Sequence, residues 1–404
     1  MEQLQGVVQN YAWGKRGLQS VVAQLQEGAD PAFRADADQT YAELWMGTHP
    51  SGPARVMSPD GSKTLLRDWL QSHPEAAGAA STTGELPFLF KVLSVNKALS
   101  IQAHPDLALA KTLHAQFPEL YKDPNHKPEM AIALTRFEAL CQFRPLDEIV
   151  AHVEAVAELR ALAGREAAHQ LMEQRDAAAL RAFFHGFIHA DRERISAAIA
   201  SLRDRLLAQA SRSALETLVL RLIDEYDVDI GCFCPYLLNY VTLEPGECVF
   251  LSANEPHAYL SGDCIECMAC SDNVVRAGLT PKFIDKATLC DMLTYRTLAP
   301  AVGSGHRVDA VARLYSPPVP EFEIEALQLP SGQQYELTKR KEPSVLLVVE
   351  GTGAVSHDRR TPVALSKGCV LLVGAGEKVT LAAETALSAF RAFPNETLAR
   401  TGDP

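Results

Sequence analysis

The spacing of apolar residues divides the chain into a β-rich beginning, a helical middle and a β-rich end. Up to residue 145, short apolar runs such as 86–93 (LPFLFKVL) alternate with Gly, Pro and Asn, which predicts strands joined by structured loops. Over 146–226, apolar residues recur at intervals of three and four among Ala, Arg and Glu, which predicts helices. From 227 onward, short Val and Leu runs bounded by Gly and Pro return, as in sandwiches and barrels.

A weak internal repeat adds detail to the β-rich parts. Residues 246–257 align without a gap with residues 368–379, a shift of 122 residues that superposes Gly246 on Gly368. A turn glycine, an apolar strand and a Glu-containing turn are typical of one jelly-roll hairpin, so two copies predict two barrels, with chance similarity as the alternative. Because Val379 aligns with His257, the second copy would lack the chemistry of His257 and would be structural.

Composition narrows the class of protein. The chain of 404 residues is 47% apolar and 22% charged, as in globular proteins, and its net charge of −12 is unsuited to binding nucleic acid. The start has no signal-peptide pattern, and no segment approaches the roughly 18 uninterrupted apolar residues of a membrane helix. We therefore expect a cytoplasmic enzyme with no membrane partner, whose nine cysteines are reduced thiols.

Four residues are candidate metal ligands. Gln102 and His104 are two positions apart, so in a strand their side chains leave the same face. Glu129 ends an ionisable cluster over 125–129, and His257 follows a proline between two predicted strands. Imidazoles, one carboxylate and one amide oxygen suit zinc or another borderline divalent ion. Taken singly, each histidine could instead be a hydrogen-bonded structural residue.

The run Cys264, Cys267 and Cys270 is similar to iron–sulfur motifs but lacks their continuation. In a strand, a spacing of three sends neighbouring side chains to opposite faces, so buried thiols are the favoured interpretation.

Several cations lie close to the candidate ligands in the sequence. Lys91, within an apolar strand run, needs a partner or a ligand, and Lys127, Arg276 and Lys282 are further candidates for holding a phosphate. Structural salt bridges are the alternative. No Walker loop, dinucleotide fingerprint or serine-nucleophile motif is present.

At these residues the sequence resembles the type I zinc-dependent mannose-6-phosphate isomerases, also called phosphomannose isomerases. The motifs that carry the resemblance are 10–14 (NYAWG), 41–50 (YAELWMGTHP), 88–93 (FLFKVL), 100–105 (SIQAHP), 121–131 (YKDPNHKPEMA), 143–145 (FRP) and the stretch 254–295. The helical block and the last 100 residues carry no such signature. Cys270 and Gln142 depart from the Ala or Thr and the Gly expected there, which affects packing more than chemistry.

The resemblance implies one zinc ion per chain, bound by Gln102, His104, Glu129 and His257, with Arg276 as catalytic arginine. It also implies a pocket for a phosphorylated hexose, lined by Lys91, Ser100, Lys127, Tyr259, Glu266 and Asp272. We add His126 and Lys282 to this set of expected pocket residues.

The implied fold is mainly β: two cupin-type jelly-roll β-barrels plus an α-helical domain. We expect a discontinuous catalytic cupin over 1–145 and 227–310, a helical domain over 146–226 and a degenerate cupin over 311–404. The monomer is the expected state.

The implied reaction interconverts mannose 6-phosphate and fructose 6-phosphate through a cis-enediol. Zinc would stabilise the developing negative charge, and Arg276 would act electrostatically rather than as a base. Glu266, His126 and Lys127 are all candidates for the proton-shuttling base. A metal-dependent cupin oxygenase and a non-catalytic sugar-binding cupin are the two rival hypotheses.

Overall fold

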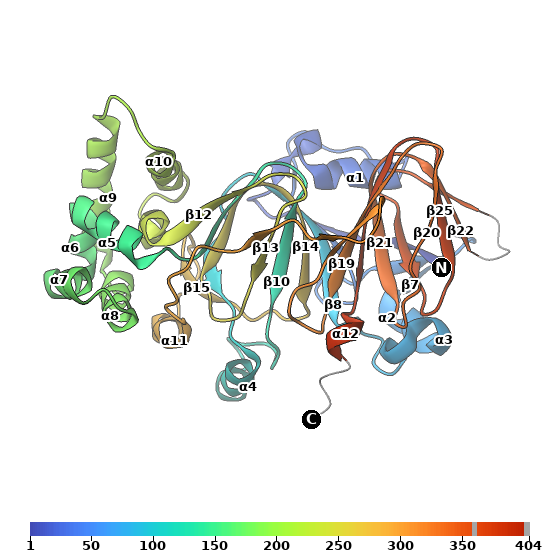
Figure 1. The fold of residues 1–404 in the computed structure, drawn as a ribbon, viewed down its shortest axis with the longest axis horizontal. Coiled ribbons are helices and arrows are strands. Elements are labelled where there is room, and N and C mark those ends of the chain that lie inside the picture. The colour runs from blue at the N-terminus through green and yellow to red at the C-terminus, as the bar shows by residue number, and fades with distance from the viewer. Residues whose placement is uncertain (358–361, 400–404) are drawn as a thin grey trace.

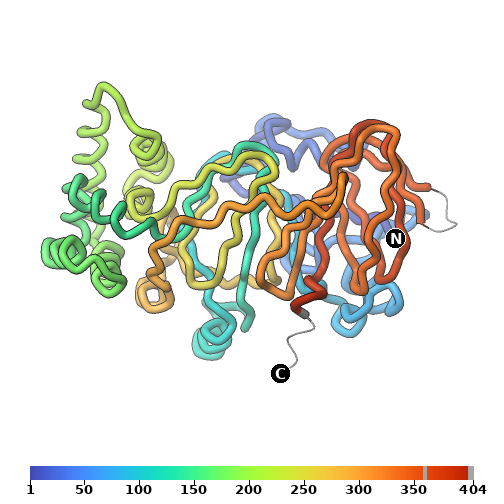
Figure 2. The backbone as a smooth tube through the Cα atoms, in the orientation of Figure 1, coloured from blue at the N-terminus to red at the C-terminus, as the bar shows by residue number. Residues whose placement is uncertain are grey.

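The computed structural model describes residues 1–357 and 362–399. The helices of residues 146–226 gather at one end of the long axis, and the β-strands form the middle and the other end, with a few shorter helices beside them (Figure 1). The N-terminus lies beside the C-terminal strands (Figure 2). The predicted helical insertion is confirmed, but helices and strands both make up large parts of the described residues, so the fold is mixed α/β rather than mainly β.

The middle of the molecule is built around the long strand β14 (His257–Ala269). It pairs with β8 (Phe88–Val95) from Gly262↔Val95 to Ala269↔Phe88, and both strands are almost wholly buried. The sheet runs in the order β16-β13-β10-β14-β8-β5-β2, with β11, β12, β9 and β15 attached beside β14. Its other strands are β2 (Val7–Gln9), β5 (Glu43–Met46), β9 (Ile101–Ala103), β10 (Glu129–Ala133), β11 (Phe137–Phe143), β12 (Leu238–Leu243), β13 (Cys248–Leu251), β15 (Val275–Gly278) and β16 (Val302–Gly303).

The sheet at the far end joins the two termini of the chain. Its order is β17-β18-β19-β26-β21-β24-β1-β6-β7, and Leu4 of β1 pairs with Val370 of β24. Strands from the first 145 residues therefore complete a sheet made mostly of C-terminal strands, which crosses the predicted domain boundary. These strands are β1 (Glu2–Gln5), β6 (Arg55–Met57), β7 (Lys63–Leu65), β17 (His306–Arg307), β18 (Ala312–Tyr315), β19 (Glu323–Leu329), β21 (Ser344–Glu350), β24 (Val370–Val373) and β26 (Leu387–Phe393).

Two smaller sheets complete the β structure of the described residues. One has the order β20-β25-β22-β23 and packs in the C-terminal part; the other pairs β3 with β4. The strands are β20 (Gln334–Glu336), β22 (Gly353–His357), β23 (Val363–Leu365), β25 (Val379–Ala383), β3 (Lys15–Arg16) and β4 (Thr40–Tyr41).

The strands follow the 122-residue repeat. β13 and β24 occupy 248–251 and 370–373, and β14 and β25 begin at His257 and Val379. The turn glycines Gly246 and Gly368 both have φ of 86°, a left-handed conformation that favours glycine. The closure of the sheets into two barrels stays a prediction.

The predicted helical block is confirmed. It comprises α5 (Leu146–Ala155), α6 (Ala157–Ala163), α7 (Arg165–Gln174), α8 (Ala177–Ile188), α9 (Arg192–Leu207) and α10 (Ala214–Tyr226). Side chains of Asp176, Asp191 and Ser213 cap the N-termini of α8, α9 and α10. Phe184 of α8 contacts Phe143 and Tyr295, with ring centroids 5.4 and 6.1 Å away, and so attaches the helices to the β core.

The prediction of strands and loops alone for residues 1–145 is wrong, because this region also contains helices. They are α1 (Val21–Ala29), α2 (Leu66–Ser72), α3 (Pro74–Ala77) and α4 (Leu107–Gln116), with 3₁₀ turns at Gly17–Gln19 and Gly78–Ser81. Each is short, so its apolar face spans few turns and gives little periodicity. Side-chain caps by Ser20 and Asp106 start α1 and α4.

The second β-rich region also has helical segments. These are the 3₁₀ helix Ile230–Tyr236, α11 (Lys286–Met292) and α12 (Glu396–Ala399). In the described ranges, the search for membrane-spanning helices finds none that is long and apolar enough.

The backbone conformation at Gln142 explains why a glycine is expected at this position. Its φ is 55°, in the left-handed region, at a bulge where the β11–β12 register shifts between Cys141 and Phe143. The Gln142 N–H donates to the carbonyl of Pro256 at 2.8 Å, which ties this bulge to the residue before His257.

Replacement of Phe184 by Ala should destabilise the fold by about 3–5 kcal/mol, because the side chain is only 2% exposed and its loss leaves a cavity. Phe117→Ala, at a position 50% exposed, is the matched control and should cost about 0.5 kcal/mol or less. Denaturant unfolding measures both. Equal losses in the two variants would contradict the proposed attachment of the helices.

Candidate active site

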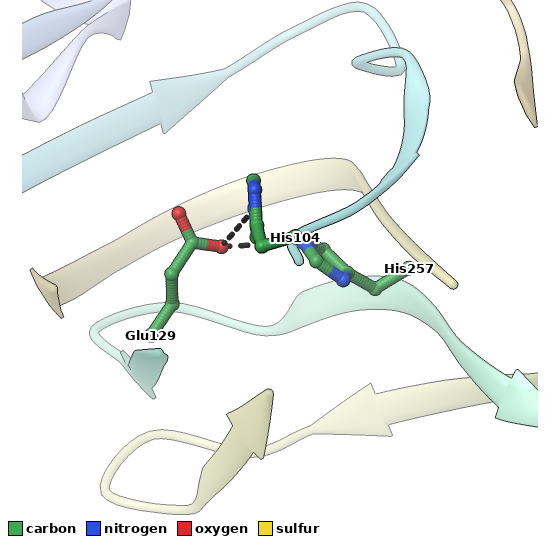
Figure 3. Close-up of side chains that lie close together, drawn as sticks. All are labelled: His104, Glu129 and His257. Atoms are coloured by element: carbon green, nitrogen blue, oxygen red, sulfur yellow. Dashed lines mark ion pairs between the residues drawn. The ribbon is translucent and has the colours of Figure 1, made fainter. Parts of the chain in front are cut away.

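Three buried side chains from three different strands converge beside β14. His104 follows β9, Glu129 is the first residue of β10 and His257 the first residue of β14. Each is 1% exposed, and their ligand atoms all lie within 4.8 Å of one another. Glu129 Oε2 is 3.3 Å from His104 Nε2 and 3.2 Å from His257 Nε2 (Figure 3).

The ring orientations leave lone pairs pointing at the centre of this cluster. His104 Nδ1 donates to the carbonyl of Asn273 at 2.7 Å, and His257 Nδ1 donates to the carbonyl of Glu255 at 3.1 Å. Burial and nearby Lys127 lower the pKa of His104 to about 4, so this ring is neutral and its Nε2 carries a lone pair.

The inward-facing atoms lack hydrogen-bond partners. Both Nε2 atoms and Glu129 Oε2 are buried, and none of the three is hydrogen-bonded within the described part of the chain. Buried acceptors without a donor are costly, whereas two imidazole nitrogens and a carboxylate oxygen are suitable ligands for a divalent cation. The cluster therefore fits a metal ion.

Strand register places Gln102 beside this cluster. Gln102 of β9 is paired with His257 of β14 on one side and with Arg276 of β15 on the other. Directly paired residues share a face of the sheet, so the three side chains project to the same side.

A cavity of about 790 Å³ opens in front of the cluster and gathers most of the predicted site residues. Its lining includes the predicted residues Lys91, Ser100, Gln102, Lys127, Glu129, Tyr259, Glu266, Asp272, Arg276 and Lys282. Segments far apart in the sequence thus contribute to one chamber with charged and apolar lining residues.

His126 is placed elsewhere. It lines a different cavity, and its Nε2 lies 2.5 Å from Glu321 Oε1. The backbone directs the neighbouring Lys127 into the candidate site and His126 away from it, so the structure does not bring His126 together with the other predicted residues.

Lys91 is neutralised by two carboxylates. Its Nζ is 3.1 Å from Glu266 Oε2 and 3.4 Å from Glu43 Oε2, and it lies 4.9 Å from the centre of the Trp45 ring. Burial alone would lower the pKa of Lys91, but Glu43 and Glu266 raise it above its usual value. Lys91 is therefore a charged side chain that already forms ion pairs with two carboxylates of the protein.

Glu129 and Glu266, two buried carboxylates that line the cavity, differ in acidity. Burial favours a raised pKa for both, yet Lys127 and His104 hold the pKa of Glu129 well below its usual range. Lys127 Nζ lies 2.5 Å from Glu129 Oε1. For Glu266, burial outweighs the attraction of Lys91, and its pKa is raised. The lowered pKa favours the anion at Glu129, whereas the raised pKa favours the protonated form at Glu266.

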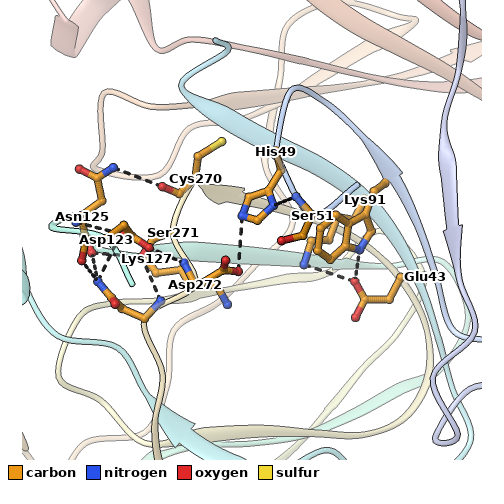
Figure 4. A network of polar contacts seen from close by, with 12 residues as sticks. Glu43, His49, Ser51, Lys91, Asp123, Asn125, Lys127, Cys270, Ser271 and Asp272 are labelled. Carbon is orange, nitrogen blue, oxygen red and sulfur yellow. Dashed lines mark hydrogen bonds and ion pairs between the residues drawn. The ribbon is translucent and has the colours of Figure 1, made fainter. Parts of the chain in front are cut away.

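Sequence reasoning assigned no role to Tyr11, Glu43, Trp45 and His49, which also line the cavity. His49 Nε2 is 3.4 Å from Asp272 Oδ1, and its hydrogen bond lowers the pKa of Asp272 (Figure 4). The signals that could have found them were the motifs 10–14, which contains Tyr11, and 41–50, where Glu43 and His49 are ionisable residues beside apolar ones.

Two cysteines of the run, Cys264 and Cys267, are buried as the favoured interpretation expects, whereas Cys270 is only partly buried. Cys264 packs in a core with Tyr259 and Leu93, and Cys267 packs in a separate core with Ile265 and Phe90. Burial raises the pKa of both thiols well above the usual value. These two thiols lie on opposite faces of β14, as the spacing of three predicts.

Comparisons with known proteins agree along the chain. The model of the phosphomannose isomerase type I catalytic domain matches residues 1–146, that of the helical insertion domain 156–238, and that of the C-terminal region 312–359. Mannose-6-phosphate isomerase of Mus musculus is 45% identical over 398 residues, covering 93% of each chain. Mannose-6-phosphate isomerase 1 of Arabidopsis thaliana is 42% identical over 408 residues, covering 98% of this chain and 94% of its own.

Solved structures give the same result. A crystal structure of mannose 6-phosphate isomerase bound with zinc and yttrium matches with a TM-score of 0.85 at 32% identity, covering 98% of this chain and 99% of that one. A mutant of phosphomannose isomerase from Salmonella typhimurium matches over the same shares with a TM-score of 0.84.

Treatment with a chelator should lower the melting temperature, and a divalent cation such as Zn²⁺ should restore it, because binding to the folded state alone stabilises that state. At a cation concentration 100 times the dissociation constant the gain is about 2.7 kcal/mol. His257→Ala should abolish the response, whereas His169→Ala, on the exposed surface of α7, should keep it. Differential scanning calorimetry measures the shifts; a full response in His257→Ala would contradict the site.

Proposed function

The chain belongs to the type I phosphomannose isomerases and is a mannose-6-phosphate isomerase, and from this premise we propose which residues perform its reaction. The buried convergence of His104 Nε2, His257 Nε2 and Glu129 Oε2 beside a cation-lined cavity carries the proposal. The reaction interconverts mannose 6-phosphate and fructose 6-phosphate, and we propose that it passes through a cis-enediol. The oxygenase and sugar-binding hypotheses gain no support from the relatives found.

We propose that one zinc ion is held by His104, Glu129 and His257, with Gln102 as the fourth ligand. The fit of the first three rests on their unpartnered ligand atoms, and that of Gln102 on its register opposite His257. When bound, zinc supplies a redox-inert Lewis acid that stabilises negative charge on the sugar oxygens.

The cations of the cavity divide into two kinds. Lys91 and Lys127 are already paired with carboxylates, so they neutralise the floor of the site. Arg276 and Lys282 line the same cavity, and no carboxylate of the described residues forms an ion pair with either. We propose that these two remain available for the phosphate or for the negative charge of the enediolate, which an arginine stabilises without losing its proton.

Glu266 is the proton-shuttling group that we propose. It lines the cavity, lies 3.1 Å from Lys91 Nζ, and has a pKa raised toward the range in which a carboxylate both accepts and returns a proton. Lys127 is the alternative, but its Nζ is already paired with Glu129 Oε1 at 2.5 Å. Ser100, Tyr259 and Asp272 would then orient the sugar from the walls.

We also propose that the β-rich parts are two cupin-type barrels, the second without catalysis because Val379 replaces His257. The domain boundaries, the monomeric state and the cytoplasmic location stay predictions.

A coupled assay for fructose 6-phosphate should show full activity in native protein, loss after chelation and recovery after addition of zinc. The loss follows because the sugar oxygens would lose their Lewis acid. Circular dichroism shows that the stripped protein remains folded. A folded stripped protein with undiminished activity would contradict the zinc assignment.

Glu266→Gln should lower isomerisation and the exchange of solvent deuterium into the product by about 100-fold or more, because the amide cannot shuttle a proton. Glu43→Gln is the matched control: it also removes a buried carboxylate partner of Lys91, but should retain exchange. NMR of the product measures the deuterium. Exchange left intact in Glu266→Gln would remove this residue from consideration.

A further inference from the structure

The loop that supplies Lys127 is attached to the C-terminal part of the chain. His126 Nε2 lies 2.5 Å from Glu321 Oε1. Glu321 stands between β18 and β19, beyond the predicted end of the catalytic part at residue 310. An acidic residue of the C-terminal part of the chain therefore contacts His126, the neighbour of the active-site residue Lys127.

Glu321 is held in a stiff segment. Three prolines, Pro317, Pro318 and Pro320, fix φ in the residues before it. Val319 and Phe322 are buried in the core shared by the two β-rich parts. The N–H of Asn395 donates to the carbonyl of Pro320 at 3.0 Å. These contacts give the carboxylate a fixed position.

In the first part of this loop, residues 123–125, backbone carbonyl groups accept hydrogen bonds from side chains of the segment 271–273. Asn273 Nδ2 donates to the carbonyls of Asp123 and Asn125 at 2.7 and 2.9 Å, and Ser271 Oγ donates to the carbonyl of Asn125 at 3.1 Å. Asp123, Asn125 and Ser271 lie close together in Figure 4, with Lys127 just beyond them. On the other side of His126 and Lys127, the N–H of Ala269 donates to the carbonyl of Pro128 at 3.1 Å.

Between these backbone anchors at Asn125 and Pro128, the loop is held by the side chains of His126 and Lys127. His126 faces one cavity and contacts Glu321, whereas Lys127 faces the other and contacts Glu129 Oε1 at 2.5 Å. Because the two residues share a peptide unit, fixing the ring of His126 limits where Lys127 can place its Nζ.

We propose that Glu321 is a positioning residue: by holding His126, it fixes Lys127 on Glu129 within the active site. Glu321 Oε2 is buried and has no hydrogen bond in the described ranges, so the contact of Oε1 with His126 is the one that anchors this carboxylate. The C-terminal part thereby contributes to catalysis without touching the substrate. This inference rests on the proposed function, because it assigns Lys127 to the reacting site.

Glu321→Ala should lower kcat/KM for mannose 6-phosphate by about tenfold or more, since a small displacement of an active-site group is costly. Glu85→Ala is the matched control: Glu85 lines the same cavity but pairs with Arg67, away from the loop, and its loss should leave kcat/KM within twofold. Zinc content and melting temperature are measured for each variant. A value for Glu321→Ala within twofold of the parent would overturn the proposal.

A double-mutant cycle separates positioning from general destabilisation. In a Lys127→Met background, Glu321→Ala should have less than a twofold further effect, because the lysine it positions is absent. Loss by the same factor in both backgrounds would overturn the proposal. Glu321→Gln keeps an oxygen for the hydrogen bond and should retain most of the activity. It replaces Glu321→Ala in the test if that variant fails to fold. A loss in Glu321→Gln as large as that in His126→Ala would count against the inference. A parent protein without isomerase activity would instead overturn the proposed function.

Discussion

The structure depends on one electrostatic constraint: three buried ligand atoms face one another, and none has a hydrogen-bond partner within the described residues. Backbone carbonyls occupy Nδ1 of His104 and His257, so both Nε2 atoms face Glu129 Oε2. Such a group is unfavourable in a dry core unless a cation joins it. Lys127, on the other oxygen of Glu129, balances part of the charge and lowers the pKa of the carboxylate. The site is therefore prepared for a metal ion by the fold itself.

β14 connects this constraint to the rest of the site. It begins at His257, carries Glu266 along its length and pairs with β8, β9, β10 and β11. One strand therefore sets the distance between a proposed metal ligand and the proposed proton shuttle, while its neighbours bring Lys91, Gln102 and Glu129 to the same chamber. Helices α5 to α10 lie at one end of the molecule, away from the C-terminal strands (Figure 1), and contribute through packing such as that of Phe184 on Phe143.

Local patterns predicted the helical block, the burial of two cysteines of the run and the candidate ligands, because each depends on spacing within one segment. His104 and Gln102 could be placed on one strand face from their separation of two residues. The pairing of β1 with β24 could not be foreseen, since it joins residues more than 360 positions apart through register that no local pattern encodes. His126 was assigned to the pocket because adjacent residues look equivalent in a sequence, whereas the backbone turns His126 and Lys127 toward different cavities. Glu43 and His49 were missed as cavity residues because their partners, Lys91 and Asp272, lie on other strands or loops.

The central claim is that nitrogen and oxygen atoms of this cluster, and no thiolate, hold the metal. X-ray absorption at the zinc K-edge of the purified protein tests it most directly, because zinc–nitrogen and zinc–oxygen distances of about 2.0–2.2 Å differ from zinc–sulfur distances of about 2.3 Å. The account predicts a shell of nitrogen and oxygen ligands with the outer scattering of two imidazoles, which His257→Ala reduces. A sulfur shell, or a spectrum unchanged in His257→Ala, would contradict it.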